Sequence, residues 1–452
     1  MRKRWSASKI GPKWARFWGI LWRTTMGEDS RIGTKIKWQL SRFAGWLSQG
    51  WGKPAARFVQ EMLFGIQASK DVKWANIARA LGEPIRLIKT ENRLSRNLGA
   101  QDRSDRLNER ILWQGASRVG TDTVLAVDLS DVTKRYARKM ECLVGVRDGS
   151  EGEKARGYWL LEIVGADVEG DQITPLYGEL YSHEAPGFAS ENDQLLKAVE
   201  RVTAMTFGRG ILAWDRGGDR YSILIPLLEA ELRFVIRQDG DRDVILESGK
   251  KMRMRKAVRW CRSRLGYSVK LEHEGYVEEK HLELGALPVR LPKKPECALW
   301  LVVIRGWGQE PILPLTNVSP EGETPERPYE KWIAEIYLTR HACEDTFRFL
   351  KQAYHVEDVR VRSYAALRNT YALVHAVMYF VSVVIGTKAR LTILFKKLCE
   401  KAKRFFQIAT FFHYAVADGI HRVLFGSPLR SCRQPSPARD LQRRFAFARP
   451  PS

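Results

Sequence analysis

Short apolar segments, glycine turns and helix-length segments alternate in the sequence from about residue 120 to residue 238. "TDTVLAVD", "MECLVGV", "GYWLLEIVGAD" and "ITPLYGELYS" are rich in β-branched and aromatic residues and predict strands. A helix is expected from Asn192 to Phe207. "GRGILAWDRGGDRYSILIPLLEAE" then predicts a strand, a glycine turn and a second helix, and "LRFVIRQDG" predicts one more strand. This alternation predicts an α/β domain rather than a helical bundle.

The predicted order is a meander of strands, a helix, a strand, a helix and a strand, which is the order of a ribonuclease-H-like domain. Residues 239–310 interrupt it with "KKMRMRKAVRWCRSRLG" and with alternating stretches such as "YSVKLEHEGYVEEKHLEL", so we predict a β-rich insertion. "PILPLTNV" predicts a strand that rejoins the core. The catalytic core is accordingly expected in two segments, 116–238 and 311–390, separated by the insertion (239–310). A helical C-terminal region with a disordered basic tail (391–452) follows.

Before this core, residues 1–26 form a basic, Trp-rich arm and residues 27–115 are expected to form an all-helical DNA-binding domain. Within it, "VKWANIARALGEPIRLIKTENRLSRNL" predicts a helix, a break at Gly82 and a second, basic helix from Pro84 to about Leu98. This pattern resembles a helix-turn-helix. Any two short helices joined at a glycine give a similar pattern, and that alternative stays open.

The charge of the whole chain indicates a polyanionic partner. Its 452 residues contain 75 Lys and Arg against 52 Asp and Glu, a net charge of +23. An anionic membrane is the main rival, but the longest apolar run, Tyr371 to Gly386, is short for a membrane span and predicts a buried core helix. The six cysteines include no CxxC pair, which favours a reducing cytoplasm. Double-stranded DNA, and not a membrane, is therefore the expected partner.

Three acidic residues stand where a metal site is expected. Asp128 and Asp215 each follow an apolar strand, and strand ends meet at one edge of an open α/β sheet. "YLTRHACEDTFRFLK" predicts an amphipathic helix whose polar stripe holds Tyr337, Arg340, Glu344 and Lys351. A solvated helix face is the plainer interpretation of that stripe. If Glu344 joins the aspartates, three carboxylates suit Mg²⁺, with Mn²⁺ as a substitute.

The same segments carry a family resemblance. "YLTRHACEDTFRFLK" resembles the Y-(2)-R-(3)-E-(6)-K motif of DDE-type bacterial insertion-sequence transposases, in the class named for the fourth insertion sequence. "DRGGDR" resembles the family's D-x-G-x-x-R box, and "VLAVDLS" looks like the strand that bears the first aspartate. The resemblance covers about residues 57–385. Two departures are His341, where the family often has Trp, and the absence of an aromatic residue in "PILPLT".

This resemblance implies a ribonuclease-H-like catalytic domain with a β-rich insertion before the glutamate. It implies that Asp128, Asp215 and Glu344 are the catalytic, metal-binding triad. It also implies that DNA phosphates are held by Tyr337, Arg340, Lys351 and Arg220. The activity implied is cleavage of the insertion sequence's own ends and their joining to target DNA by two-metal phosphodiester transfer, with a homodimer on the DNA.

A further DNA contact is expected in the insertion. Lys250 to Arg264 carries eight Lys and Arg and no acidic residue, and Arg253, Arg255, Arg259 and Arg262 are the candidate DNA-binding residues. Two other functions remain open. One is a ribonuclease-H-like nuclease that cuts without joining, and the other is a catalytically inactive DNA-binding relic or repressor.

Overall fold

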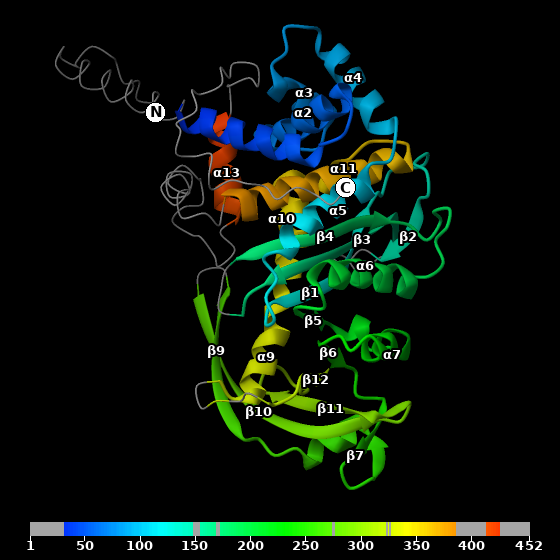
Figure 1. The fold of residues 1–452 in the computed structure, drawn as a ribbon, viewed down its shortest axis with the longest axis vertical. Helices are drawn as coiled ribbons and strands as arrows, with labels where there is room; N and C mark the ends of the chain where they lie inside the picture. Colours follow the sequence, from blue (N-terminus) through cyan, green and yellow to red (C-terminus); the bar gives the residue numbers. More distant parts are fainter. Residues whose placement is uncertain are drawn as a thin grey trace, which may run out of the picture.

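The structure is a computed structural model that describes residues 31–147, 154–168, 172–273, 276–321, 324, 327–385 and 413–424. The basic arm, the tail and most of the predicted C-terminal region lie outside the described residues. The chain forms a mixed α/β structure in which helices cover a large sheet (Figure 1).

One half of the sheet is built from the region that the sequence predicts to be α/β. β1 pairs antiparallel with β3 and β3 antiparallel with β4, whereas β1, β5 and β6 run parallel to one another. The predicted meander, helix, strand, helix and strand are all present. The strands and helices are β1 (Val124–Thr133), β2 (Val144–Arg147), β3 (Lys154–Ala166), β4 (Ile173–Tyr181), α6 (Glu191–Thr206), β5 (Ile211–Trp214), η1 (Arg216–Gly218), α7 (Tyr221–Glu229) and β6 (Phe234–Gln238).

The other half of the sheet comes from the insertion. Its strands pair antiparallel, and β12 pairs with β6, so that the strand predicted in "PILPLTNV" joins the two halves. A single sheet of twelve strands results. The elements of this half are β7 (Asp243–Leu246), β8 (Lys251–Arg253), α8 (Met254–Ala257), η2 (Val258–Trp260), β9 (Leu265–His273), β10 (Tyr276–Leu291), β11 (Lys294–Arg305) and β12 (Leu313–Thr316).

Most of the helices lie on two sides of the first half-sheet, whereas α9 (Tyr329–Thr339) packs mainly on the strands of the insertion and on β6. Residues 31–47 are helical. The helices that follow are α2 (Lys53–Ser69), α3 (Trp74–Leu81), α4 (Leu87–Gly99) and α5 (Ser104–Ala116). After β12 come α9 (Tyr329–Thr339), α10 (His341–Tyr354), η3 (Val356–Asp358), α11 (Tyr364–Tyr379), the π-helical η4 (Phe380–Ile385) and α13 (His413–Leu424).

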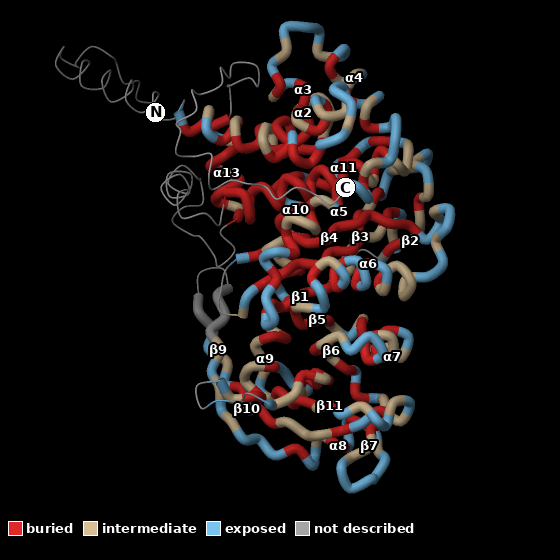
Figure 2. The backbone as a smooth tube through the Cα atoms, in the orientation of Figure 1, coloured by how far each residue is buried: buried red, intermediate tan, exposed pale blue. Residues whose placement is uncertain are grey.

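Two large hydrophobic cores follow from this layering. One joins the N-terminal helices to α10, α11 and α13, and the other lies under α6 and α7 and extends into the insertion (Figure 2). Phe64 of α2, Ile111 of α5 and Tyr379 of α11 are all fully buried in the first core. The N-terminal helices therefore depend on the helices that follow the sheet for burial of their apolar side chains.

The predicted core helix lies in the middle of that first core. The stretch Tyr364–Ile385 is long and apolar enough to cross a membrane by length and composition, and 94% of its most apolar window is buried inside the protein. Its apolar surface is thus already covered by other parts of the chain.

Candidate active site

The register of the parallel strands places two aspartates side by side. Val124 of β1 lies beside Ile211 of β5, and Val127 lies beside Trp214. Asp128 and Asp215 are each the next residue after that last pair. Neighbouring strands lie about 4.8 Å apart, so the backbone alone holds these two carboxyl groups close together.

The prediction that Asp128 ends its strand is wrong. β1 continues to Thr133, because β3 supplies antiparallel partners from Glu162, opposite Asp128, to Gly157, opposite Thr133. Only the ladder with β5 stops at Val127. Asp128 therefore stands where β1 loses the neighbour on one of its two sides. Asp215 does end its strand, and its Oδ1 accepts a hydrogen bond of 2.7 Å from the N–H of Gly217.

Asp128 lies in a site with excess negative charge. Its Oδ1 accepts from the N–H of Leu129 at 2.9 Å, and its Oδ2 lies 3.4 Å from a guanidinium nitrogen of Arg340. Burial raises the pKa of Asp128 to about 7; Arg340 opposes this shift, and the negative charges of Asp215 and Glu344 add to it. The site therefore carries more negative charge than Arg340 neutralises.

Glu344 comes from the first turn of α10 and is held by two neighbours. Arg340 donates to its Oε1 at 2.7 Å, and Nδ1 of His341 lies 3.1 Å from its Oε2. The hydrogen bond from His341 is the main cause that lowers the pKa of Glu344 to about 2; burial opposes it and Arg340 reinforces it. Glu344 is thus ionised at neutral pH. His341, which departs from the family pattern, contacts the predicted metal ligand directly.

Arg340 joins the carboxylates of β1 and α10. Its side chain is only 7% exposed, and it pairs with both Asp128 and Glu344. Its Nε is buried and has no hydrogen-bond partner in the described part of the chain. A buried guanidinium with an unsatisfied donor has capacity for one more oxygen ligand.

The donor set fits a divalent cation, but the present spacing does not. Three carboxylates without a nearby thiol suit Mg²⁺ or Mn²⁺. Among the residues that the structure describes, no group of three or more His, Cys, Asp and Glu side chains is spaced to hold a metal ion. The guanidinium of Arg340 lies between Asp128 and Glu344 instead. Asp128, Asp215 and Glu344 can therefore bind one cation only if the side chain of Arg340 moves out from between Asp128 and Glu344.

The prediction that the motif forms one continuous helix is also wrong. α9 ends at Thr339 and α10 begins at His341, and the turn between them is closed by hydrogen bonds from the N–H of Arg340 to Tyr337 and from the N–H of Cys343 to Arg340, at 3.3 and 3.0 Å. α9 packs on strands of the insertion and on β6, whereas α10 packs on β1 and β3. The two helices therefore cover different parts of the sheet.

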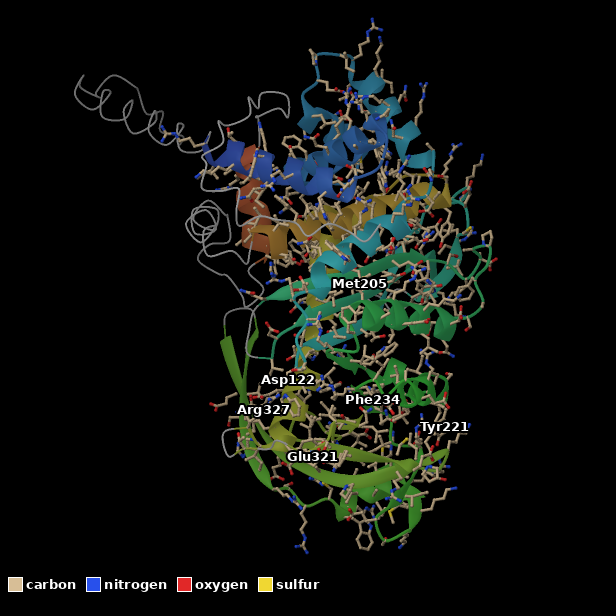
Figure 3. All side chains as sticks on the ribbon, in the orientation of Figure 1. Asp122, Met205, Tyr221, Phe234, Glu321 and Arg327 are labelled. Atoms are coloured by element: carbon tan, nitrogen blue, oxygen red, sulfur yellow. The ribbon has the colours of Figure 1, made fainter. Side chains whose placement is uncertain are left out.

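An ion pair joins the residues just before α9 to the residues just before β1. Arg327 donates to Asp122 at 3.1 and 3.2 Å, and the two labelled side chains lie near each other in Figure 3. The guanidinium of Arg327 also stacks on Trp332 of α9, 3.8 Å from the ring centre. These contacts fix the helix pair that delivers Arg340 and Glu344 to the strand that carries Asp128.

The other motif residues make contacts within the protein. Tyr337 is buried, and Arg237 lies 3.5 Å from its hydroxyl. Lys351 pairs with Asp131 at 3.5 Å and with Glu357 at 3.3 Å. Tyr337 and Arg340 are buried, so the polar stripe of the motif is not a solvated helix face.

Arg220 also makes its contacts inside the fold. It donates to Asn192 at 2.8 Å and to Glu191 at 2.7 Å, and so ties the turn after β5 to the start of α6. Contact of Arg220 with a phosphate stays a prediction, as it does for Tyr337 and Lys351.

Sequence reasoning missed Arg237. Trp214 of β5 lies beside Ile236 of β6, so the next residues, Asp215 and Arg237, are neighbours. The rule that found the two aspartates, a polar residue at the end of an apolar parallel strand, applies equally to "FVIRQ". Arg237 lines a hollow of about 170 Å³, together with Arg216, Gln238, Asp239, Arg255, Val258, Glu310, Pro311 and Leu313. The three arginines of this hollow outnumber its two acidic residues by one charge, which makes it a candidate anion site.

The predicted DNA-binding arginines of the insertion are all exposed. They differ in their partners. Arg253 pairs with Asp243 and Arg255 with Asp241, each at 3.5 Å, whereas Arg259 and Arg262 form no ion pair with any described residue. Arg259 and Arg262 can therefore contact a phosphate without first breaking an ion pair to a described residue.

α3 and α4 are separate helices joined where the sequence predicts the break. Gly82 ends α3 with φ +58°, a left-handed conformation that glycine adopts without strain. α4 exposes one face, with Ile88 55% exposed and Asn92 and Arg96 also exposed. Arg93 points inward and pairs with Glu61 and Glu83. The exposed face mixes cationic, amide and apolar side chains, which are the types that read base edges.

Comparison with known proteins leaves the family open. No family model matches the chain. No curated protein matches it either. Among solved structures, the cryo-EM structure of a piggyBac transposase synaptic complex with hairpin DNA is similar with a TM-score of 0.41 and 10% sequence identity, over 91% of this chain and 83% of that chain. Similarity at this level identifies neither the family nor the activity of this chain.

Proposed function

We propose that the protein is a DNA transposase that uses divalent cations to cleave the ends of its own insertion sequence and to join them to target DNA. The observation that carries this proposal is that Asp215 follows the strand beside that of Asp128, while the buried guanidinium of Arg340 joins Asp128 to Glu344 of α10. The strand order β4, β3, β1, β5, β6 supports a ribonuclease-H-like core for this chemistry.

The three carboxylates have the chemistry to hold Mg²⁺ or Mn²⁺. Such ions, when bound, activate a water or hydroxyl and stabilise the leaving oxygen of a phosphodiester. Asp128 has a raised pKa because it is buried among like charges, and a cation would relieve that repulsion. Glu344 is already ionised and needs no proton loss to become a ligand.

Arg340 has a second role in this proposal. Its guanidinium holds Asp128 and Glu344 together, and its unpartnered Nε provides a donor for a phosphate oxygen. If Asp128 and Glu344 held a cation, Arg340 would be free to donate to a phosphate oxygen of the DNA backbone. Arg237 and Arg216 at the neighbouring hollow supply further donors along the same strand of DNA.

Binding to DNA is assigned to surfaces outside this centre. The exposed face of α4 is proposed to read base edges, and Arg259 and Arg262 of the insertion to hold the backbone. A homodimer on DNA and a place in the bacterial cytoplasm, near the nucleoid, belong to the same proposal.

The test uses purified full-length protein, Mg²⁺ and a duplex that carries the inverted repeats flanking the coding sequence. The expected products are strands cut at the repeat and then joined to a second, labelled duplex. Cleavage without any joined product would favour the nuclease. Binding to the repeat without cleavage in Mg²⁺ or Mn²⁺ would favour the inactive relic, and would overturn the proposed function.

A further inference from the structure

The segment that follows β1 carries an unusual group of exposed side chains. Its sequence from Lys134 to Lys139 is "KRYARK", with four cations and one aromatic residue in six positions. Tyr136 is 96% exposed, the highest value among the exposed large hydrophobic side chains of the described residues. Arg138 and Lys139 are exposed and form no ion pair with any described residue. These side chains contribute little to the stability of the fold.

The segment is nevertheless held in place by its backbone and by Lys134. The N–H of Lys134 donates to the carbonyl of Arg156 at 2.7 Å, and the N–H of Ala137 closes a turn to Lys134 at 3.0 Å. Nζ of Lys134, which is buried, donates to the carbonyls of Glu357 and, at 3.1 Å, Val359. An exposed basic turn is thus anchored to the segment that follows α10.

That second segment brings more cations to the same place. The N–H of Glu141 donates to the carbonyl of Arg362 at 3.0 Å, and the carboxylate of Glu141 accepts from the N–H of Tyr364 at 2.8 Å. Arg360 and Arg362 are exposed, and neither forms an ion pair with a described residue. We name the group formed by Tyr136, Arg138, Lys139, Arg360 and Arg362 the basic loop surface.

The basic loop surface lies within reach of the candidate active site. α10 runs beside β1, because Arg340 pairs with Asp128 at one end and Lys351 with Asp131 further along. Lys134 and Tyr136 follow Asp128 by six and eight residues. β1 ends at Thr133, five residues after Asp128, so at about 3.3 Å per strand residue the turn begins roughly 17 Å from Asp128, which is the length of about five base pairs.

The surface lies on the opposite side of the site from the insertion. In the sheet, β3 and β2 flank β1 on one side, and β5, β6, β12 and the insertion follow on the other (Figure 1). A duplex that crosses the site from the insertion would next meet the basic loop surface. Cations interleaved with an exposed aromatic ring favour nucleic acid over an acidic protein, because the ring can stack on a base.

We propose that the basic loop surface binds the phosphate backbone of DNA that extends past the cleavage point, and that Tyr136 stacks on an unpaired base there. This inference rests on the proposed function for the position of the cleavage point. Binding of DNA to the surface can be measured without any cleavage, so the two proposals fail separately.

The first test is a salt titration of binding to a 30-base-pair duplex of random sequence. The variant Arg138→Gln, Lys139→Gln, Arg360→Gln is compared with wild type and with the control Arg118→Gln, Lys197→Gln, Lys293→Gln, which removes three exposed charges elsewhere. The surface variant should lower the log–log salt slope by up to about 2.7, at about 0.9 per lost contact, and the control by much less. A slope equal to that of wild type would overturn the proposal.

A second arm locates the surface. The same variants are titrated on repeat DNA that stops at the mapped cut and on repeat DNA that continues 15 base pairs beyond it. The loss should appear on the extended DNA alone, and an equal loss on both would overturn the placement.

The third test concerns Tyr136. Tyr136→Ala should bind a duplex with a three-nucleotide gap about tenfold more weakly than wild type and an intact duplex less than about twofold more weakly. Tyr136→Phe keeps the ring and should bind gapped DNA as wild type does. Unaltered binding of gapped DNA by Tyr136→Ala would refute the stacking role. The unfolding temperatures of both variants should match wild type, since the side chain is almost fully exposed.

Discussion

Arginines at the candidate active site and arginines on the insertion differ in burial and in partners. The side chain of Arg340 is 7% exposed and contacts Asp128 and Glu344. Arg259 and Arg262 are exposed and have no ion pair within the described residues. Charges in a poorly hydrated site interact strongly, whereas salt screens charges in water. The same residue type therefore fixes geometry in the centre and attracts a polyanion at the periphery.

This difference predicts two kinds of mutant. Changes at the centre should alter the chemistry while leaving DNA affinity nearly intact. Changes at the periphery should alter DNA affinity and its dependence on salt. A central mutant with strongly weakened DNA affinity, or a peripheral mutant with impaired chemistry, would show that the two regions do not have separate roles.

The largest effect is expected from Asp215→Asn. It removes one negative charge and one ligand oxygen without changing size, so strand cleavage should fall at least about 1,000-fold, or about 4 kcal/mol in the barrier. Affinity for repeat DNA, measured by fluorescence anisotropy, should change less than about threefold. The matched control is Asp345→Asn on α10, whose carboxylate pairs with Arg348 at 2.8 Å rather than with the central site. Cleavage by Asp215→Asn at the wild-type rate would remove Asp215 from the proposed triad.

The next effect is a dependence of metal affinity on pH. The pKa of Asp128 is raised to about 7, chiefly by burial, so this carboxyl group holds a proton below pH 7 in the metal-free protein. A cation must displace that proton, and apparent affinity should fall about tenfold for each pH unit below 7 and level off above it. Titration of Mn²⁺ by electron paramagnetic resonance between pH 5 and 8 measures this directly. Affinity that stays constant from pH 5 to 7 would show that Asp128 is not a ligand.

A smaller effect is expected at α4. Asn92→Ala with Arg96→Ala should reduce the preference for repeat DNA over scrambled DNA by about 10- to 100-fold, because a base contact is worth about 1–3 kcal/mol. Arg106→Ala, an exposed position on α5, is the control and should leave the preference unchanged. Preserved preference in the double mutant would exclude α4 as the reading helix.

Point substitutions at α4 are preferable to deletion of residues 1–115. Phe64 of α2 and Ile111 of α5 are fully buried in a core shared with α11. Deletion would expose the partners of both side chains and would destabilise the catalytic region itself.

The smallest effect compares paired and unpaired arginines of the insertion. Arg259→Gln with Arg262→Gln should weaken binding to all sequences and lower the log–log salt slope by up to about 1.8, at about 0.9 per contact. Arg253→Gln with Arg255→Gln should lower it less, since Asp243 and Asp241 already compete with phosphate for these side chains. Equal slopes for the two double mutants would show that the acidic partners do not matter.

Much of the candidate site followed from local sequence pattern. Apolar runs followed by a polar residue point to Asp128 and Asp215, and the same pattern occurs at Arg237. Strand length was harder to predict. β1 continues beyond Asp128 because β3 pairs with it as far as Gly157, and such a partner is not visible in the local sequence.

The helix motif, too, is predicted in part by local sequence and depends in part on packing against distant segments. Its period predicts helix from Tyr337 to Lys351, and the residues are helical apart from the turn at Arg340. The break depends on the sheet, because α9 and α10 pack on different strands. The pairing of Arg340 with Asp128 likewise depends on contacts between residues far apart in the sequence.

Diffraction from crystals of the complex with repeat DNA and Mn²⁺, recorded at the manganese absorption edge, tests the proposed metal centre most directly. We expect anomalous peaks bounded by Asp128, Asp215 and Glu344, with ligand oxygens about 2.1 Å from the ion, and with Arg340 turned from the carboxylates to a DNA phosphate. Manganese bound elsewhere, or Arg340 still joining Asp128 and Glu344 in the presence of manganese and DNA, would contradict the assignment of these three residues as the metal ligands.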